Sequence, residues 1–108
     1  MSRTSLCQSS VVVGTTADAS GPIHLENWIC GEIYVPEGSS LTLLTWYTAE
    51  KIGGTYLPAY TDDISSPVAV EQVVAAGKAY PVPTYLAGAA SLKAVGNAAG
   101  TIHVNLKA

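Results

Sequence analysis

The chain alternates short hydrophobic runs with turn-forming residues and sustains no helical pattern. Residues 101–107 are the clearest example, because Ile102, Val104 and Leu106 occupy alternate positions with polar side chains between them. A repeat of two residues places each set on its own side of a β-strand. Glycine and proline separate the runs, as is typical of short strands joined by turns. We predict strands over Ser10–Gly14, Trp28–Val35, Leu41–Thr48, Thr55–Tyr60, Val68–Val74, Ala79–Val82, Ser91–Val95 and Thr101–Lys107.

These runs predict an all-β fold, namely a single small antiparallel β-sandwich or jelly-roll-like domain of about seven or eight short strands. Residues 10–108 are expected to form this domain. Residues 1–9 lack a hydrophobic pattern and are expected to form a flexible N-terminal arm. At most one short helical turn is expected, within residues 83–89. The last two strands are expected to pair as a hairpin around residues 96–100.

Two predicted strands carry unusual residues. Pro58 lies within the strand at residues 55–60, so this strand is expected at a sheet edge or in a bend. The strand at residues 41–48 has large side chains on both faces, since Leu43 and Tyr47 alternate with Leu44 and Trp46. Its second face is either covered by the core or forms an interface, and the sequence leaves both interpretations open.

The amino-acid composition argues against several classes of protein. Hydrophobic residues make up 48% of the 108 residues and charged residues 12%, with a formal net charge of −3. This balance is not that of a disordered chain. The few lysines and arginines are scattered, whereas nucleic-acid-binding proteins gather them into a basic patch. No run is long and apolar enough to span a membrane, and the first residues lack the hydrophobic stretch of a signal peptide. We expect no nucleic acid and no membrane as partners.

The chain has two cysteines, Cys7 and Cys30. In a reducing compartment both are expected to be free thiols, although the sequence does not settle whether they pair. Cys30 follows the apolar residues Trp28 and Ile29 and is expected to be a small core residue. Cys7 lies in the polar arm and is expected to be exposed.

Candidate catalytic and metal-binding residues are few. His24 lies two residues before Glu26 and would share a strand face with it, but a metal site needs at least one further ligand. His24 and His103 are both expected to be surface or hydrogen-bonded structural residues. Asp62 and Asp63 lie among hydroxyl residues, and we expect them to cap the backbone of a turn because the ligand spacing of calcium loops is absent. We therefore expect no enzyme activity, no cofactor and no metal.

The aromatic residues point to a binding surface more strongly than the candidate catalytic residues point to an active site. The chain has 6 tyrosines and 2 tryptophans and no phenylalanine. Tyrosine and tryptophan suit half-buried surfaces because each has a polar end. Tyr34, Trp46, Tyr47, Tyr56 and Tyr60 gather in the middle third of the chain. They either pack the sandwich or form a recognition surface for a protein or a glycan.

The middle and end of the chain carry a recognisable series of motifs. They are residues 31–42 leading into Leu44-Thr45-Trp46-Tyr47, the run Gly53-Gly54-Thr55-Tyr56-Leu57-Pro58-Ala59-Tyr60, and residues 73–83, 92–96 and 100–107. Through these motifs the chain, from residue 21 to the C-terminus, resembles short all-β proteins encoded by tailed phages and prophages, often among head genes. It is similar in style to capsid decoration (cement) proteins.

The resemblance implies a virion structural protein, most simply a decoration protein that stabilises the head by binding across major capsid protein subunits. The implied partners are the major capsid protein and further copies of the chain, as a trimer or a dimer. Synthesis would occur in the host cytoplasm and the final location would be the capsid surface. The candidate contacts, chosen from the arm and the aromatic residues, are Arg3, Ser5, Cys7, Tyr34, Trp46, Tyr56 and Tyr60. A neck, tail or spike protein is the first alternative, and a carbohydrate-binding β-sandwich module is the second.

Overall fold

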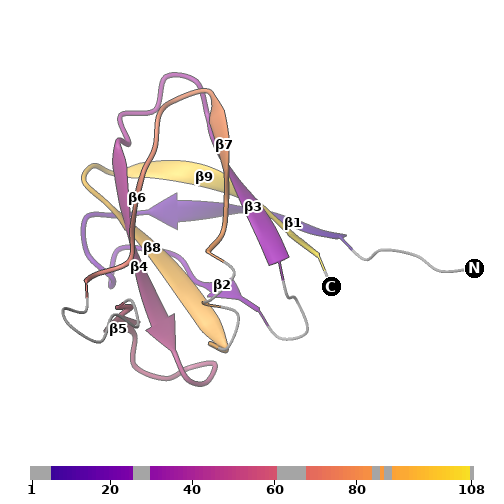
Figure 1. Ribbon diagram of the computed structural model, residues 1–108, viewed down its shortest axis with the longest axis vertical. Coiled ribbons are helices and arrows are strands. Elements are labelled where there is room, and N and C mark those ends of the chain that lie inside the picture. The colour runs from indigo at the N-terminus through magenta and orange to yellow at the C-terminus, as the bar shows by residue number, and fades with distance from the viewer. Residues whose placement is uncertain (1–5, 26–29, 61–67, 84–85, 87–88, 108) are drawn as a thin grey trace, which may run out of the picture.

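A computed structural model shows two antiparallel β-sheets (Figure 1). It describes residues 6–25, 30–60, 68–83, 86 and 89–107. Sheet A has the order β1-β9-β3-β7, and its strands are β1 Leu6–Val13, β3 Cys30–Val35, β7 Lys78–Pro81 and β9 Gly100–Lys107. Sheet B has the order β2-β8-β4-β5, with β6 also paired to β4. Its strands are β2 Ile23–His24, β4 Leu43–Ala49, β5 Leu57–Pro58, β6 Glu71–Val73 and β8 Ser91–Gly96.

The core lies between the two sheets, and it forms because strands of both sheets alternate hydrophobic and polar positions. Ile102, Val104 and Leu106 of β9 are buried, as the sequence pattern predicts. Leu44 and Trp46 of β4 are buried from the other sheet. Burying one such side chain contributes about 1.5–3 kcal/mol. The prediction of an all-β fold in a small two-sheet domain is therefore confirmed.

The N-terminal boundary of the fold differs from the prediction. Residues 6–9, which the sequence places in a flexible arm, belong to β1 and continue its pairing with β9 as far as Leu6 opposite Lys107. Strand pairing needs only backbone groups, so the polar run Gln8-Ser9-Ser10 forms a strand without a hydrophobic pattern. Residues 1–5 lie outside the described residues.

The expected hairpin of the last two strands is wrong, because β8 belongs to sheet B and β9 to sheet A. The connecting segment crosses between the sheets. Asn97 holds it beside β4, since its side-chain oxygen accepts hydrogen bonds from the backbone N–H groups of Thr42 and Leu43. The Gly96 N–H donates to the carbonyl of Gly14 at 2.9 Å, which ties the crossing to the end of β1.

The two cysteines lie on opposite faces of sheet A, in the reverse of the predicted environments. Ile33 and Val35 face the core, so alternation directs Cys30 outward, where it is exposed. Cys7 is half-buried and packs against the core. Both are free thiols, as expected.

Other short elements follow from local sequence. Pro58 lies in the two-residue strand β5, which among the described residues pairs with β4 alone at the end of sheet B, in agreement with the predicted edge position. Strand β2 was not predicted, because two residues show no periodicity. The expected helical turn at residues 83–89 falls largely outside the described residues, although the Leu86 N–H donates to the Pro83 carbonyl at 3.1 Å.

In the described part of the chain, no helix has the length and hydropathy needed to cross a membrane.

Candidate contact surface

The predicted contact residues do not form one surface. Tyr34 is 39% exposed on the outside of sheet A, and Tyr60, which bridges to Ala69, is 59% exposed at the margin of sheet B. Tyr56 is half-buried beside β8. Arg3 and Ser5 lie outside the described residues.

Trp46 was wrongly predicted as a surface contact. Its side chain has 0% exposure and belongs to the core. The indole N–H donates to the side-chain oxygen of Gln72 at 2.8 Å, and the Gln72 amide donates to the Pro81 carbonyl at 2.8 Å. Trp46 therefore helps to link sheet B to the edge of sheet A rather than to contact a partner.

The outer side of sheet A is a regular surface of paired strands, and it carries the predicted contact residue Tyr34. We call it the sheet A face and define it by side chains of β1, β9 and β3 that alternate with the core positions. Ser10, His103 and Tyr34 form one cross-strand row on it, and the Ser10 hydroxyl contacts Nδ1 of His103 at 3.0 Å. The members are Gln8, Ser10, Val12, Cys30, Glu32, Tyr34, Thr101, His103, Asn105 and Lys107.

The sheet A face is mostly polar with few charges. Its acidic residue Glu32 is diagonal to its basic residue Lys107 across β3 and β9. A hollow of about 440 Å³ lies in this region, lined by Cys30, Gly31, Glu32, Tyr34, Asn105 and Lys107. A surface of this composition suits contact with another protein, because amide, hydroxyl and tyrosine groups can exchange water for partner hydrogen bonds.

A hydrogen-bonded cluster on sheet B surrounds Ser91, whose side chain is fully buried. Its hydroxyl contacts Nδ1 of His24 at 3.0 Å and the Tyr56 hydroxyl at 2.6 Å, and it donates to the Ile23 carbonyl at 3.3 Å. With the His24 proton on Nδ1, His24 and Tyr56 both donate to the Ser91 hydroxyl oxygen, while the Ser91 proton goes to the Ile23 carbonyl. The cluster therefore fixes β2 and the segment before β5 to β8, and it shows that His24 is hydrogen-bonded through Nδ1.

Lys93 completes this cluster from the same strand. Its ammonium nitrogen lies 4.5 Å from the centre of the Tyr56 ring and donates to the Ala17 carbonyl at 2.8 Å. A cation over an aromatic ring is stabilising. The contact also occupies one face of the Tyr56 ring, so a sugar could not stack on that face.

Replacing Ser91 with alanine is expected to reduce the free energy of unfolding by about 1–3 kcal/mol, because His24, Tyr56 and the Ile23 carbonyl would lose a shared buried partner. Urea denaturation followed by circular dichroism measures this loss. Replacement of the exposed Ser40 by alanine is the matched control, and equal stability of the two variants would contradict the structural role of Ser91.

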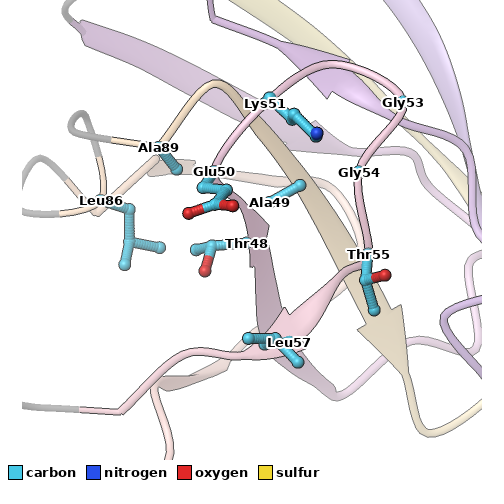
Figure 2. Close-up of a pocket in the computed structure, with 10 residues that line it drawn as sticks. All are labelled: Thr48, Ala49, Glu50, Lys51, Gly53, Gly54, Thr55, Leu57, Leu86 and Ala89. Carbon is cyan, nitrogen blue, oxygen red and sulfur yellow. The ribbon is translucent and has the colours of Figure 1, made fainter.

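A pocket that the sequence did not predict lies at the end of β4 (Figure 2). Its volume is about 740 Å³, and the close-up shows Thr48 and Glu50 between Leu86 and the turn that leads to β5. Gly53, with φ of 83°, shapes that turn. The full lining is Thr48, Ala49, Glu50, Lys51, Gly53, Gly54, Thr55, Leu57, Leu86 and Ala89. The only sequence signal was the Gly53-Gly54 pair, which marks a turn and not a cavity.

Within the described residues, no group of three or more His, Cys, Asp or Glu side chains is placed to hold a metal ion. Glu26, Asp62 and Asp63, which were considered as ligands from the sequence, lie outside those residues.

Comparison with known proteins supports the fold. No protein-family model matches the chain, and no curated protein matches it in sequence. Among solved structures, the chain is similar to the SPBc2 prophage-derived protein YomS, with a TM-score of 0.62 and 6% sequence identity. The superposition covers 100% of this chain and 97% of YomS. The similarity therefore extends over the whole two-sheet domain and concerns the fold.

Proposed function

We propose that this protein is a structural component of a phage virion and acts as a capsid decoration protein on the head surface. The observation that carries the proposal is the whole-length similarity in fold to a prophage-derived protein. The sequence motifs that resemble phage head-associated proteins support it independently. In this proposal, the protein stabilises the head by binding across major capsid protein subunits.

The sheet A face is our candidate for this contact. Its strands pair continuously from β1 through β9 to β3, and their inner side chains pack in the core. A surface fixed in this way loses little conformational entropy on binding. A specific interface of standard size buries about 1,600 Å² in total, which would involve much of this face.

Replacing Tyr34 with alanine is expected to weaken binding to heads by about tenfold or more, because central tyrosines often dominate the energy of an interface. Tyr60→Ala is the matched control, since it removes an exposed tyrosine from the margin of sheet B. Co-sedimentation of each variant with purified heads that lack the protein measures the affinity. If Tyr60→Ala alone weakened binding, the contact would lie on sheet B and the assignment of the sheet A face would be wrong.

The copy number per virion separates decoration from the other virion roles. A simple ratio to the major capsid protein, measured by quantitative mass spectrometry, is the result expected for decoration. A few copies per particle would instead indicate a neck, tail or spike protein. Absence from virions, together with no binding to heads, would overturn the proposal of a virion protein.

The pocket at the end of β4 favours one alternative, a carbohydrate-binding module. Thr48, Glu50 and Thr55 offer hydrogen-bonding groups beside the apolar Leu57 and Leu86, a mixture that suits sugar rings. A glycan array tests this alternative. Binding that Glu50→Gln abolishes and Tyr34→Ala leaves unchanged would favour the glycan module over decoration.

A further inference from the structure

Strand β1 pairs with β9 on one side, and among the described residues the first half of its other side is open. On the side away from β9, the Val12 carbonyl accepts a hydrogen bond from the Gly21 N–H at 2.8 Å. Backbone groups alternate between the two sides of a strand, so Leu6, Gln8 and Ser10 direct their N–H and C=O groups to the same open side as Val12. Among the described residues, none bonds to these three there. The start of β1 also extends from the body of the domain towards the N-terminus (Figure 1).

This edge lacks the features that prevent strand addition. Natural edge strands are blocked by charged residues, prolines or bulges, and the opposite edge strand of sheet A, β7, contains both Lys78 and Pro81. The sequence of β1 is LCQSSVVV, with no charged residue and no proline. Its register with β9 is one-to-one over its full length, so it contains no bulge. The open side of β1 is therefore able to accept another strand.

We propose that β1 pairs with β1 of a second copy of the chain, antiparallel and around a twofold axis at Gln8. Leu6 then lies opposite the partner's Ser10, and Gln8 lies opposite the partner's Gln8. All of these residues direct their backbone groups to the open side, so each opposing pair exchanges two hydrogen bonds. The two four-stranded A sheets become one continuous sheet, joined by the self-complementary contact that a twofold axis requires.

The side chains on this edge favour an identical strand as the occupant. The Gln8 side chain is exposed on the sheet A face, opposite Asn105 of β9. An amide carries both a donor and an acceptor, so two Gln8 side chains can bond to each other across the axis. In each copy, Asn105 of β9 lies beside Gln8 in the same cross-strand row. Among the described residues of the two copies, no like charges meet in this row, because its acidic residue, Glu32, lies two strands away from Gln8.

The test uses the full-length chain without heads, so its result does not depend on the proposed virion function. Sedimentation equilibrium from micromolar to millimolar concentration is expected to show a dimer. Gln8→Lys places two like charges at the axis and is expected to raise the dimer dissociation constant by about tenfold or more. Thr101→Lys is the matched control, because it adds the same charge to the same face one strand from the edge, and it is expected to leave the dimer unchanged.

A mixing experiment tests whether Gln8 lies on the twofold axis of the dimer. Gln8→Lys and Gln8→Glu, each of which is expected to dimerise weakly alone, are expected to form a tighter mixed dimer when combined, because opposite charges then meet at the axis. Circular dichroism of each variant confirms that it is folded. A wild-type chain that is monomeric at every concentration would overturn the proposal, and so would a dimer that Gln8→Lys leaves intact. A monomeric chain whose head binding is lost in Gln8→Lys but kept in Thr101→Lys would assign the open edge to a strand of the head protein instead, since both changes put a charge on the sheet A face and only the first lies at its edge.

Discussion

Replacing Trp46 with alanine is expected to reduce the free energy of unfolding by about 3–5 kcal/mol. Trp46 is the largest of the fully buried side chains, so its truncation leaves a cavity between the sheets. It also leaves the Gln72 side-chain oxygen without the indole donor. Domains of this size have a total stability of about 5–15 kcal/mol, so the variant would lose a large part of it.

Urea denaturation followed by far-ultraviolet circular dichroism measures this loss without relying on tryptophan fluorescence. Trp46→Phe is the matched variant, because it keeps an aromatic ring in the core and removes only the N–H donor and part of the volume. We expect its stability to lie between those of wild type and Trp46→Ala. A Trp46→Ala variant as stable as wild type would contradict the place of Trp46 in the core.

Gly96→Ala is expected to destabilise the fold by about 1–3 kcal/mol through overpacking. A Cβ atom at this position would lie 2.6 Å from Cδ2 of Leu41 and 2.8 Å from both Cγ1 of Val13 and the carbonyl oxygen of Ala98. The last of these is a backbone atom and cannot move without disturbing the crossing between the sheets. Gly96 is therefore required for space, where β8 leaves sheet B.

Gly100→Ala is the control for this prediction. It lies at the other end of the same connection, and its nearest neighbour, Cδ1 of Leu41, would be 3.3 Å from the added Cβ. Thermal and urea unfolding of both variants should give a clearly lower stability for Gly96→Ala. Equal losses would indicate that the crossing relaxes around an added methyl group at either site.

The fold class was accessible from sequence because strand signals are local. The alternation at residues 101–107 correctly identified the buried side chains Ile102, Val104 and Leu106. The connection after β8 was not accessible in the same way. A turn-rich loop can either fold a chain back within one sheet or carry it to the other. Here the chain crosses to the other sheet, and the side chain of Asn97 in this connection accepts hydrogen bonds from backbone N–H groups at the start of β4.

The candidate surface was only partly predictable. An exposed Tyr34 and a buried Trp46 look equivalent in sequence, because both lie in strands with large residues on two faces. Only the assembly of the two sheets determines which face is covered. Alternation along the strand from Ile33 and Val35 places the Cys30 side chain on the opposite, outer face. The prediction that Cys30 lies in the core relied instead on the apolar neighbours Trp28 and Ile29. Neither the pocket at β4 nor the open edge of β1 has a local signal, since both depend on which strands become neighbours.

The pairing of Leu6 with Lys107 has a mechanical consequence. Tension applied between these two positions would act on the β1–β9 ladder one residue pair at a time, beginning with this outermost pair. The strands would unzip at low force instead of sliding past each other, a motion in which all pairs share the load. A pull on these two ends of the ladder would therefore peel β1 away from sheet A.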